Sequence, residues 1–212
     1  MSESPAVSAP QPICLKDYAP PAFFIDELAL DVDVRAEACI VSARLSCRRN
    51  SLAAPGAALE LDGEDLETLS VALDGVPLAA SEYMLGEQRL VLPAAPERFV
   101  LETQVRIRPA ANTQLSGFYA SRDGYFTQCE PQGFRRITWF IDRPDVMARY
   151  RVTLHADKTA FPVLLANGNP VAQGDESDGR HFATWEDPFP KPSYLFAMVA
   201  GKLDVLRDTF RT

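Results

Sequence analysis

Histidine is scarce in this sequence of 212 residues, which has only two, His155 and His181. No His-Glu-x-x-His segment occurs, so the usual motif that supplies two histidine ligands to zinc is absent. A Gly-x-Ser-x-Gly elbow is also missing, and the 11 glycines are scattered in turns rather than gathered in a phosphate loop. We interpret both histidines as solvated strand residues and predict no metal site and no complete active site in this chain.

Positive charge and long apolar runs are also limited. Lys and Arg total 21 against 29 Asp and Glu, which argues against a nucleic-acid partner and favours cationic ligands. No apolar run approaches the roughly 20 residues of a membrane-spanning helix. The N-terminus has no basic start followed by an apolar core, so we expect no secretory signal and a cytoplasmic protein.

The four cysteines, Cys14, Cys39, Cys47 and Cys129, form no Cys-x-x-Cys pair. Cys39 and Cys47 share one strand-like run and are too far apart to bridge if that run is straight. We therefore predict free thiols in a reducing compartment, packed as small apolar side chains.

Alternation of apolar and polar residues is the dominant pattern and predicts strands with one dry face. It is clearest in four runs, where the apolar positions are Leu28, Leu30, Val32 and Val34; Cys39, Val41, Ala43, Leu45 and Cys47; Phe99, Leu101, Val105 and Ile107; and Tyr150, Val152 and Leu154. No long stretch has a helical period. We predict an all-β antiparallel sandwich with long loops and at most one or two short helical turns, the best candidate following Pro131.

Four turn dipeptides separate the predicted strands and favour hairpins, because Asn, Asp and Gly tolerate positive φ. They are Asp62-Gly63, Asp74-Gly75, Asn167-Gly168 and Asp178-Gly179. Residues 1–20 are rich in proline and are expected to form an extended lead-in.

The segment YFTQCEPQGFRRITWFIDRPD, residues 125–145, places Glu130 at the end of a predicted strand and directly before Pro131. Taken alone, this position favours a carboxylate that caps the N–H groups of the turn. The alternative is a carboxylate that meets a cationic ligand.

The same segment resembles the N-terminal domain of zinc aminopeptidases of the aminopeptidase N family, in the bacterial alanyl aminopeptidase branch. The matching residues are Gln128, Glu130, Arg135, Arg136, Asp142 and Pro144, and the later segment EDPFPKPSYLFAMVAG, residues 186–201, also resembles this domain. The resemblance is strong after about Pro96. It implies a saddle-shaped β domain over residues 1–202, with residues 203–212 as the first strand or linker of a catalytic domain that is absent.

The resemblance also implies roles for these residues. Glu130 would bind the α-ammonium of a peptide substrate, because a cation that leaves water needs a negative partner. Gln128 would line the pocket for the first side chain, and the alternative is an exposed polar residue of the strand. Arg135, Arg136 and Asp142 would form ion pairs that fix the loop. The zinc cofactor and the general base would lie in the absent catalytic domain, so this chain alone should be inactive.

Two alternatives belong to other classes. The same domain occurs in relatives without the zinc site, which would make the chain a scaffold or protein-binding domain. A free-standing adhesion module would need exposed aromatic residues, but both tryptophans, Trp139 and Trp185, lie in apolar surroundings.

Overall fold

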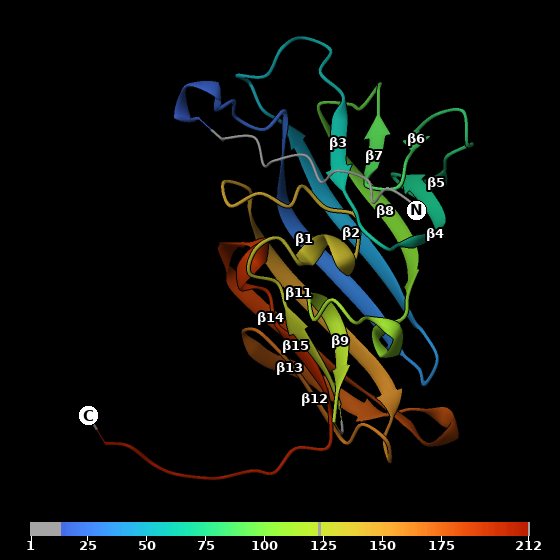
Figure 1. Cartoon of the computed structure of the whole chain (residues 1–212), viewed down its shortest axis with the longest axis vertical. Coiled ribbons are helices and arrows are strands. Elements are labelled where there is room, and N and C mark those ends of the chain that lie inside the picture. The colour runs from blue at the N-terminus through green and yellow to red at the C-terminus, as the bar shows by residue number, and fades with distance from the viewer. Residues whose placement is uncertain (1–13, 123, 212) are drawn as a thin grey trace, which may run out of the picture.

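The computed structural model describes residues 14–122 and 124–211. Figure 1 shows two small sheets lying over one face of a large sheet. The large sheet has eight strands in the order β13-β14-β11-β1-β2-β8-β4-β5. Their bounds are β1 Phe23–Val34, β2 Cys39–Arg49, β4 Glu67–Leu73, β5 Val76–Pro77, β8 Arg98–Ile107, β11 Met147–Asp157, β13 Asn169–Asp175 and β14 Arg180–Pro192.

The two smaller sheets have four and three strands, in the orders β12-β15-β10-β9 and β3-β7-β6. Their bounds are β9 Gly117–Ser121, β10 Gly124–Gln128, β12 Val163–Ala166, β15 Met198–Gly201, β3 Leu59–Asp62, β6 Met84–Leu85 and β7 Arg89–Leu92. The all-β sandwich predicted from the sequence is therefore confirmed.

The core lies between the large sheet and the two smaller ones. All sixteen apolar positions expected on the dry faces of the four alternating runs are buried. Two Phe rings, Phe23 and Phe99, meet edge to face within this core, and Trp139 is also fully buried there. The period-two pattern thus correctly identified which face of each strand is apolar.

One pair of strands differs from the antiparallel prediction. Strands β1 and β11 run parallel, with Leu28 opposite Tyr150 and Val32 opposite Leu154. Alternation reveals the face on which a side chain lies but not the direction of the neighbouring strand. Parallel neighbours need a long connection, and here the two smaller sheets are formed largely within it.

Only two of the four predicted hairpins are present. Asp74-Gly75 joins β4 to β5, and Asp178-Gly179 joins β13 to β14, all with positive φ. Asn167-Gly168 instead leads from the four-stranded to the eight-stranded sheet. Asp62-Gly63 leaves the three-stranded sheet, and a Cβ at Gly63 would lie 2.3 Å from the Trp139 ring. Glycine is needed at position 63 for close packing rather than for a hairpin.

Helical structure in the described ranges consists of five 3-10 turns of three residues, more than the one or two expected. They are η1 Leu15–Asp17, η2 Pro109–Ala111, η3 Phe134–Arg136, η4 Ser177–Gly179 and η5 Ser193–Leu195. The turn expected after Pro131 corresponds to η3. The others lie in connections, and a proline begins η2 and directly precedes η5, where its fixed φ favours a tight turn.

The described residues at the two ends of the chain, 14–22 and 202–211, contain no strand. Residues 1–13 of the predicted lead-in lie outside the described residues, and residues 14–20 contain η1. Residues 202–211 form no strand and extend away from the sheets (Figure 1). The division at residue 202 remains a prediction. No described helix is long and apolar enough to cross a membrane.

Candidate functional site

Gln128 and Glu130 lie where β10 ends. Gln128 is the last residue of β10 and pairs with Gly117 of β9. Gln128 and Glu130 are both exposed, whereas Cys129 between them is buried, and this burial raises the pKa of its thiol. The strand period therefore continues to Glu130 and directs both polar side chains to the surface.

The Glu130 carboxylate accepts no hydrogen bond and forms no ion pair with any residue in the described part of the chain. Its backbone carbonyl lies 3.5 Å from Gln128 Nε2, a long contact. The turn is closed by its own backbone, because Gly133 N–H donates to the carbonyl of Cys129 at 2.9 Å. The geometry thus gives no support to the turn-cap alternative for Glu130.

Glu130 stands at an open hollow of about 500 Å³. The hollow is lined by Glu130, Pro131, Gln132, Asp142, Arg143, Pro144, Ser193 and Tyr194. The guanidinium of Arg143 is engaged elsewhere, donating to both carboxylate oxygens of Asp145 at 2.9 and 2.7 Å. This contact lowers the pKa of the Asp145 carboxyl. Glu130 is therefore the carboxylate in this hollow that has no cationic partner among the described residues.

Arg135 and Asp142 form the ion pair expected across the loop. The backbone N–H and Nε–H of Arg135 donate to Asp142 Oδ2 at 3.2 and 3.0 Å. Asp142 is only 2% exposed, so its charge depends on these donors. A buried carboxylate that loses its partner is strongly destabilising.

Two further residues complete this cluster, and sequence reasoning missed both. The Ser193 hydroxyl donates to Asp142 Oδ1 at 2.5 Å. Asp62, also buried, accepts the Asp142 backbone N–H at 3.2 Å and lies 2.9 Å from Arg89 Nη1. The sequence indicates Asp62 only as a turn residue, and Ser193 lies in the resembling segment 186–201 without any role being expected for it. The cluster links η3, η5 and β3 behind the Glu130 turn.

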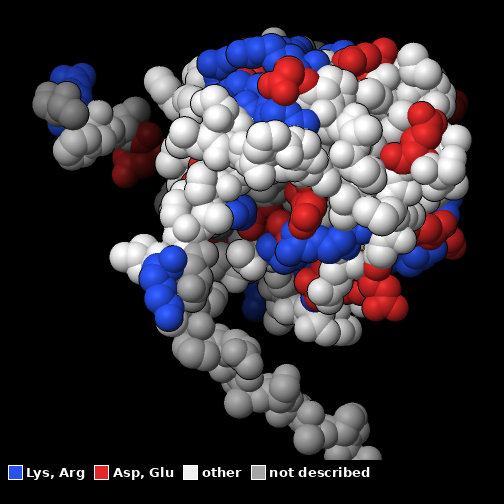
Figure 2. Space-filling model, turned by 90° about the horizontal axis from the view of Figure 1, so that it is seen from above, with Lys and Arg blue, Asp and Glu red and all other residues white. Residues whose placement is uncertain are grey.

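The cluster also borders a second hollow of about 640 Å³, whose lining includes Asp62, Arg89, Arg135 and Asp142. Figure 2, which views the molecule from above, shows acidic side chains next to basic ones on the face that it presents. The charges at this hollow are mutually paired.

Among the described residues, Asp142 forms its ion pair with Arg135 and not with Arg136. The Arg136 guanidinium forms ion pairs with Glu64 and Asp65, in the connection between β3 and β4. The two neighbouring arginines therefore tie η3 to different segments.

Gly133 allows the turn to pack against the strands behind it. A Cβ at this position would lie 2.3 Å from the carbonyl oxygen of Gln128 and 2.9 Å from the backbone nitrogen of Gly117. Only a residue without a side chain fits here, so the position of the turn relative to β9 and β10 is fixed by backbone contact.

Both histidines are half-buried rather than solvated, and neither lines the hollow at Glu130. His155 lies between Glu176 and Asp31, at 2.7 and 3.1 Å, and His181 Nε2 is 2.8 Å from the carbonyl of Phe161. Within residues 14–122 and 124–211, no group of three or more His, Cys, Asp or Glu side chains could hold a metal ion. The described residues therefore do not fit a zinc site, and we assign no chemical step to zinc in this chain.

All four cysteines are free, and Cys39, Cys47 and Cys129 are buried, whereas Cys14 is half-buried. Burial raises the pKa of both the Cys39 and Cys47 thiols to about 12. These thiols are therefore protonated at neutral pH and behave as small apolar side chains.

Comparison with known proteins connects this geometry to a family. The Peptidase M1 N-terminal domain matches residues 25–195. The aminopeptidase N of Caulobacter vibrioides is 52% identical over 203 residues, which cover 96% of this chain and 23% of that protein. The chain thus spans about a quarter of the length of the curated relatives that it matches.

Solved structures agree with the sequence matches. Legionella pneumophila aminopeptidase A, crystallised with aspartic acid, has a TM-score of 0.86 at 33% identity, covering 90% of this chain and 22% of that one. A mutant M1 zinc metallopeptidase from Deinococcus radiodurans, bound to a Tyr-Ser-Ala substrate, has a TM-score of 0.73 at 16% identity. The match covers 85% of this chain and 42% of that one. The second likeness is one of fold alone.

Proposed function

Because the chain belongs to the Peptidase M1 N-terminal domain family, we propose that it is the substrate-anchoring domain of a zinc aminopeptidase that releases N-terminal residues from peptides. In this proposal Glu130 binds the α-ammonium of the substrate. The partners of the domain are then the N-terminus of a peptide and the catalytic part of a longer polypeptide, which would hold the zinc ion.

The observation that carries the proposal is the contrast between Glu130 and the carboxylates around it. Asp62, Asp142 and Asp145 each have a cationic partner, whereas Glu130 has none among the described residues. An exposed, unpaired carboxylate beside a hollow is suited to receive an ammonium group, with which it forms strong charge-assisted hydrogen bonds.

The surrounding residues would hold Glu130 in position. Two ion pairs, Arg135 with Asp142 and Arg136 with Glu64 of the β3–β4 connection, hold the turn in place. Rigid support of this kind keeps a binding group in its productive geometry. Gln128, exposed on the same side, would contact the first side chain of the substrate.

The scaffold alternative and the cytoplasmic location remain predictions. A His-Glu-x-x-His segment in the longer polypeptide would favour the enzyme over a scaffold. The free thiols are compatible with a reducing compartment.

The test uses the full-length enzyme and substitutions of Glu130. A hydrogen bond to a charged group is worth roughly 1.5–3 kcal/mol, so Glu130→Ala should lower kcat/KM by roughly 10- to 200-fold. Glu130→Gln keeps the shape but not the charge and should recover little activity. Glu37→Ala, which removes another exposed glutamate, is the matched control.

Two inhibitors that differ only in a primary amine make this test specific. Glu130→Ala should weaken binding of the amine-bearing inhibitor and leave binding of the deamino inhibitor unchanged. A turn cap would instead destabilise the isolated chain by about 0.5–2 kcal/mol. The proposal is wrong if Glu130→Ala lowers the melting temperature of the isolated chain but changes kcat/KM of the full-length enzyme by less than about twofold, which corresponds to less than about 0.5 kcal/mol.

A further inference from the structure

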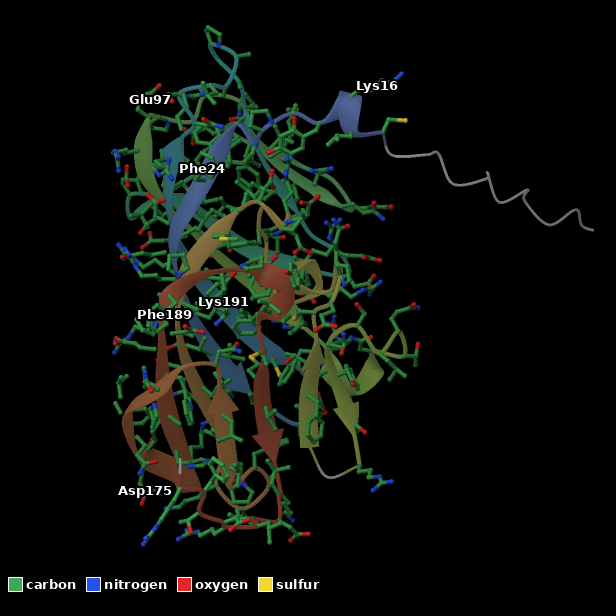
Figure 3. The ribbon with its side chains drawn as sticks, turned by 90° about the vertical axis from the view of Figure 1, so that its left-hand side faces the viewer. Lys16, Phe24, Glu97, Asp175, Phe189 and Lys191 are labelled. Atoms are coloured by element: carbon green, nitrogen blue, oxygen red, sulfur yellow. The ribbon has the colours of Figure 1, made fainter. Side chains whose placement is uncertain are left out.

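A looped bulge within β14 interrupts its pairing with β11. Tyr150 is opposite Asp187, but Ala148 is opposite Lys191, so three residues of β14 face the single residue Arg149. These three residues are Pro188, Phe189 and Pro190, and we call residues 187–191 the Phe189 loop. Figure 3 places Phe189 on the opposite side of the molecule from β9 and β10.

The base of the Phe189 loop is held by an ion pair between Lys191 and Asp187, both largely buried. Lys191 Nζ also lies 4.8 Å from the centre of the Tyr150 ring, and burial lowers the pKa of this lysine. The Phe189 N–H donates to Asp187 Oδ1 at 3.4 Å. Prolines on both sides of Phe189 restrict φ, so the loop is held in one shape.

This rigid loop presents an aromatic ring to solvent. Phe189 is 75% exposed, and of the twelve phenylalanines only Phe210, in the segment after β15, is more exposed. Burial of an aromatic side chain is strongly favourable, and aromatic anchors that are already ordered bind with a smaller loss of entropy. A fixed, exposed phenylalanine is therefore typical of an interface anchor.

The surface beside the loop is suited to a neutral partner. A hollow of about 320 Å³ begins at Pro188 and lies over β11 and β1. Its charged side chains are already paired, Arg149 with Glu27 and Arg151 with Glu186. The complement of Phe189 would then be an apolar pocket rather than a charged surface.

We propose that the Phe189 loop is a docking point for the remaining part of the longer aminopeptidase polypeptide, which receives Phe189 in an apolar pocket. The curated relatives are about four times as long as the aligned region, and the solved structures carry this fold within chains that it covers only to 22–42%. The additional polypeptide in such proteins is a partner held at high effective concentration. This inference rests on the proposed place of the chain in a longer aminopeptidase polypeptide, but not on the role of Glu130.

Thiol accessibility tests the proposal in both the 212-residue chain and the full-length enzyme. Cys14→Ser removes the half-buried thiol, and Phe189→Cys places a thiol at the tip of the loop. Leu52→Cys is the matched control, because Leu52 is 79% exposed in a different turn. Mass spectrometry of the peptides then gives the maleimide labelling rate at each position.

We expect equal labelling rates at positions 189 and 52 in the 212-residue chain. In the full-length enzyme, labelling at position 189 should be at least about tenfold slower than at position 52, because thiol reactivity follows exposure. Phe189→Ala should lower the melting temperature of the full-length enzyme but not of the shorter chain, and Leu52→Ala should change neither. Equal labelling rates in the full-length enzyme, or a melting temperature insensitive to Phe189→Ala, would overturn the proposal. Protection of position 189 in the shorter chain that increases with concentration would identify a second copy as the occupant and also overturn it.

Discussion

Glu130 and Asp142 are acids twelve positions apart in one loop, yet they lie in opposite environments. Both Asp142 oxygens accept hydrogen bonds and the residue is buried, whereas Glu130 is exposed and lacks a partner in the described ranges. Substitution of Asp142 should therefore act mainly on folding, and substitution of Glu130 mainly on ligand binding.

Ser193 offers a sharper test of the buried cluster. Ser193→Ala would remove the donor to Asp142 Oδ1 and leave a buried oxygen without that hydrogen bond. Such a loss costs about 1–3 kcal/mol, so we expect the free energy of unfolding of the isolated chain to fall by this amount in urea denaturation. Ser46→Ala, in β2, is the control. Equal stability of the two variants would show that the Ser193 hydrogen bond is not important for folding.

Sequence reasoning reached Glu130, Arg135 and Asp142 because they fall within one recognisable segment. It gave no role to Asp62, which lies 80 residues before Asp142, or to Ser193, which lies 51 residues after it in the second resembling segment. Their contribution depends on which segments meet in the folded chain, and a serine or aspartate in a loop has no distinctive local pattern. The ion pair could be predicted from sequence, but the cluster around it required the fold.

At the scale of elements, the position of the Glu130 turn depends on its contact with β9 and β10. Gly133→Ala would place a Cβ 2.3 Å from the Gln128 carbonyl, so the turn must shift. Overpacking of this kind typically costs about 1–3 kcal/mol. We expect the isolated chain to lose stability and the full-length enzyme to lose affinity for an amine-bearing inhibitor.

Gly86→Ala provides the control for this substitution. Its added methyl group would lie at an ordinary distance, 3.6 Å from the carbonyl oxygen of Arg89. If Gly133→Ala binds the amine-bearing inhibitor as tightly as Gly86→Ala does, the position of the turn is not set by this backbone contact.

The predicted elements were more reliable than their connections. Alternation correctly gave the buried face of β1, β2, β8 and β11, because burial of a strand face directly requires it. The same pattern could not show that β1 and β11 run parallel, nor that two of four turn dipeptides lead between sheets. Those features are set by tertiary pairing, which residue periodicity does not encode.

At the scale of the whole molecule, we predict that the 212-residue chain folds alone, binds no stoichiometric zinc and cleaves no aminoacyl substrate. Its continuous core provides stability, and its described residues offer no metal-ligand group. A chelator should therefore leave its melting temperature unchanged. One tightly held zinc ion per chain in metal analysis would contradict this prediction, and the full-length enzyme serves as the positive control.

The parallel pairing of β1 with β11 also has a consequence for the order of folding. The two strands lie side by side inside the eight-stranded sheet but are separated by more than one hundred residues of sequence. During synthesis, β1, β2, β8 and β4 can associate before β11 leaves the ribosome, and one edge of β1 then remains unpaired. Contacts between such distant residues slow folding, and open strand edges favour aggregation. We therefore expect the seam between β1 and β11 to close late, and to be the place where a nascent chain most needs protection by chaperones.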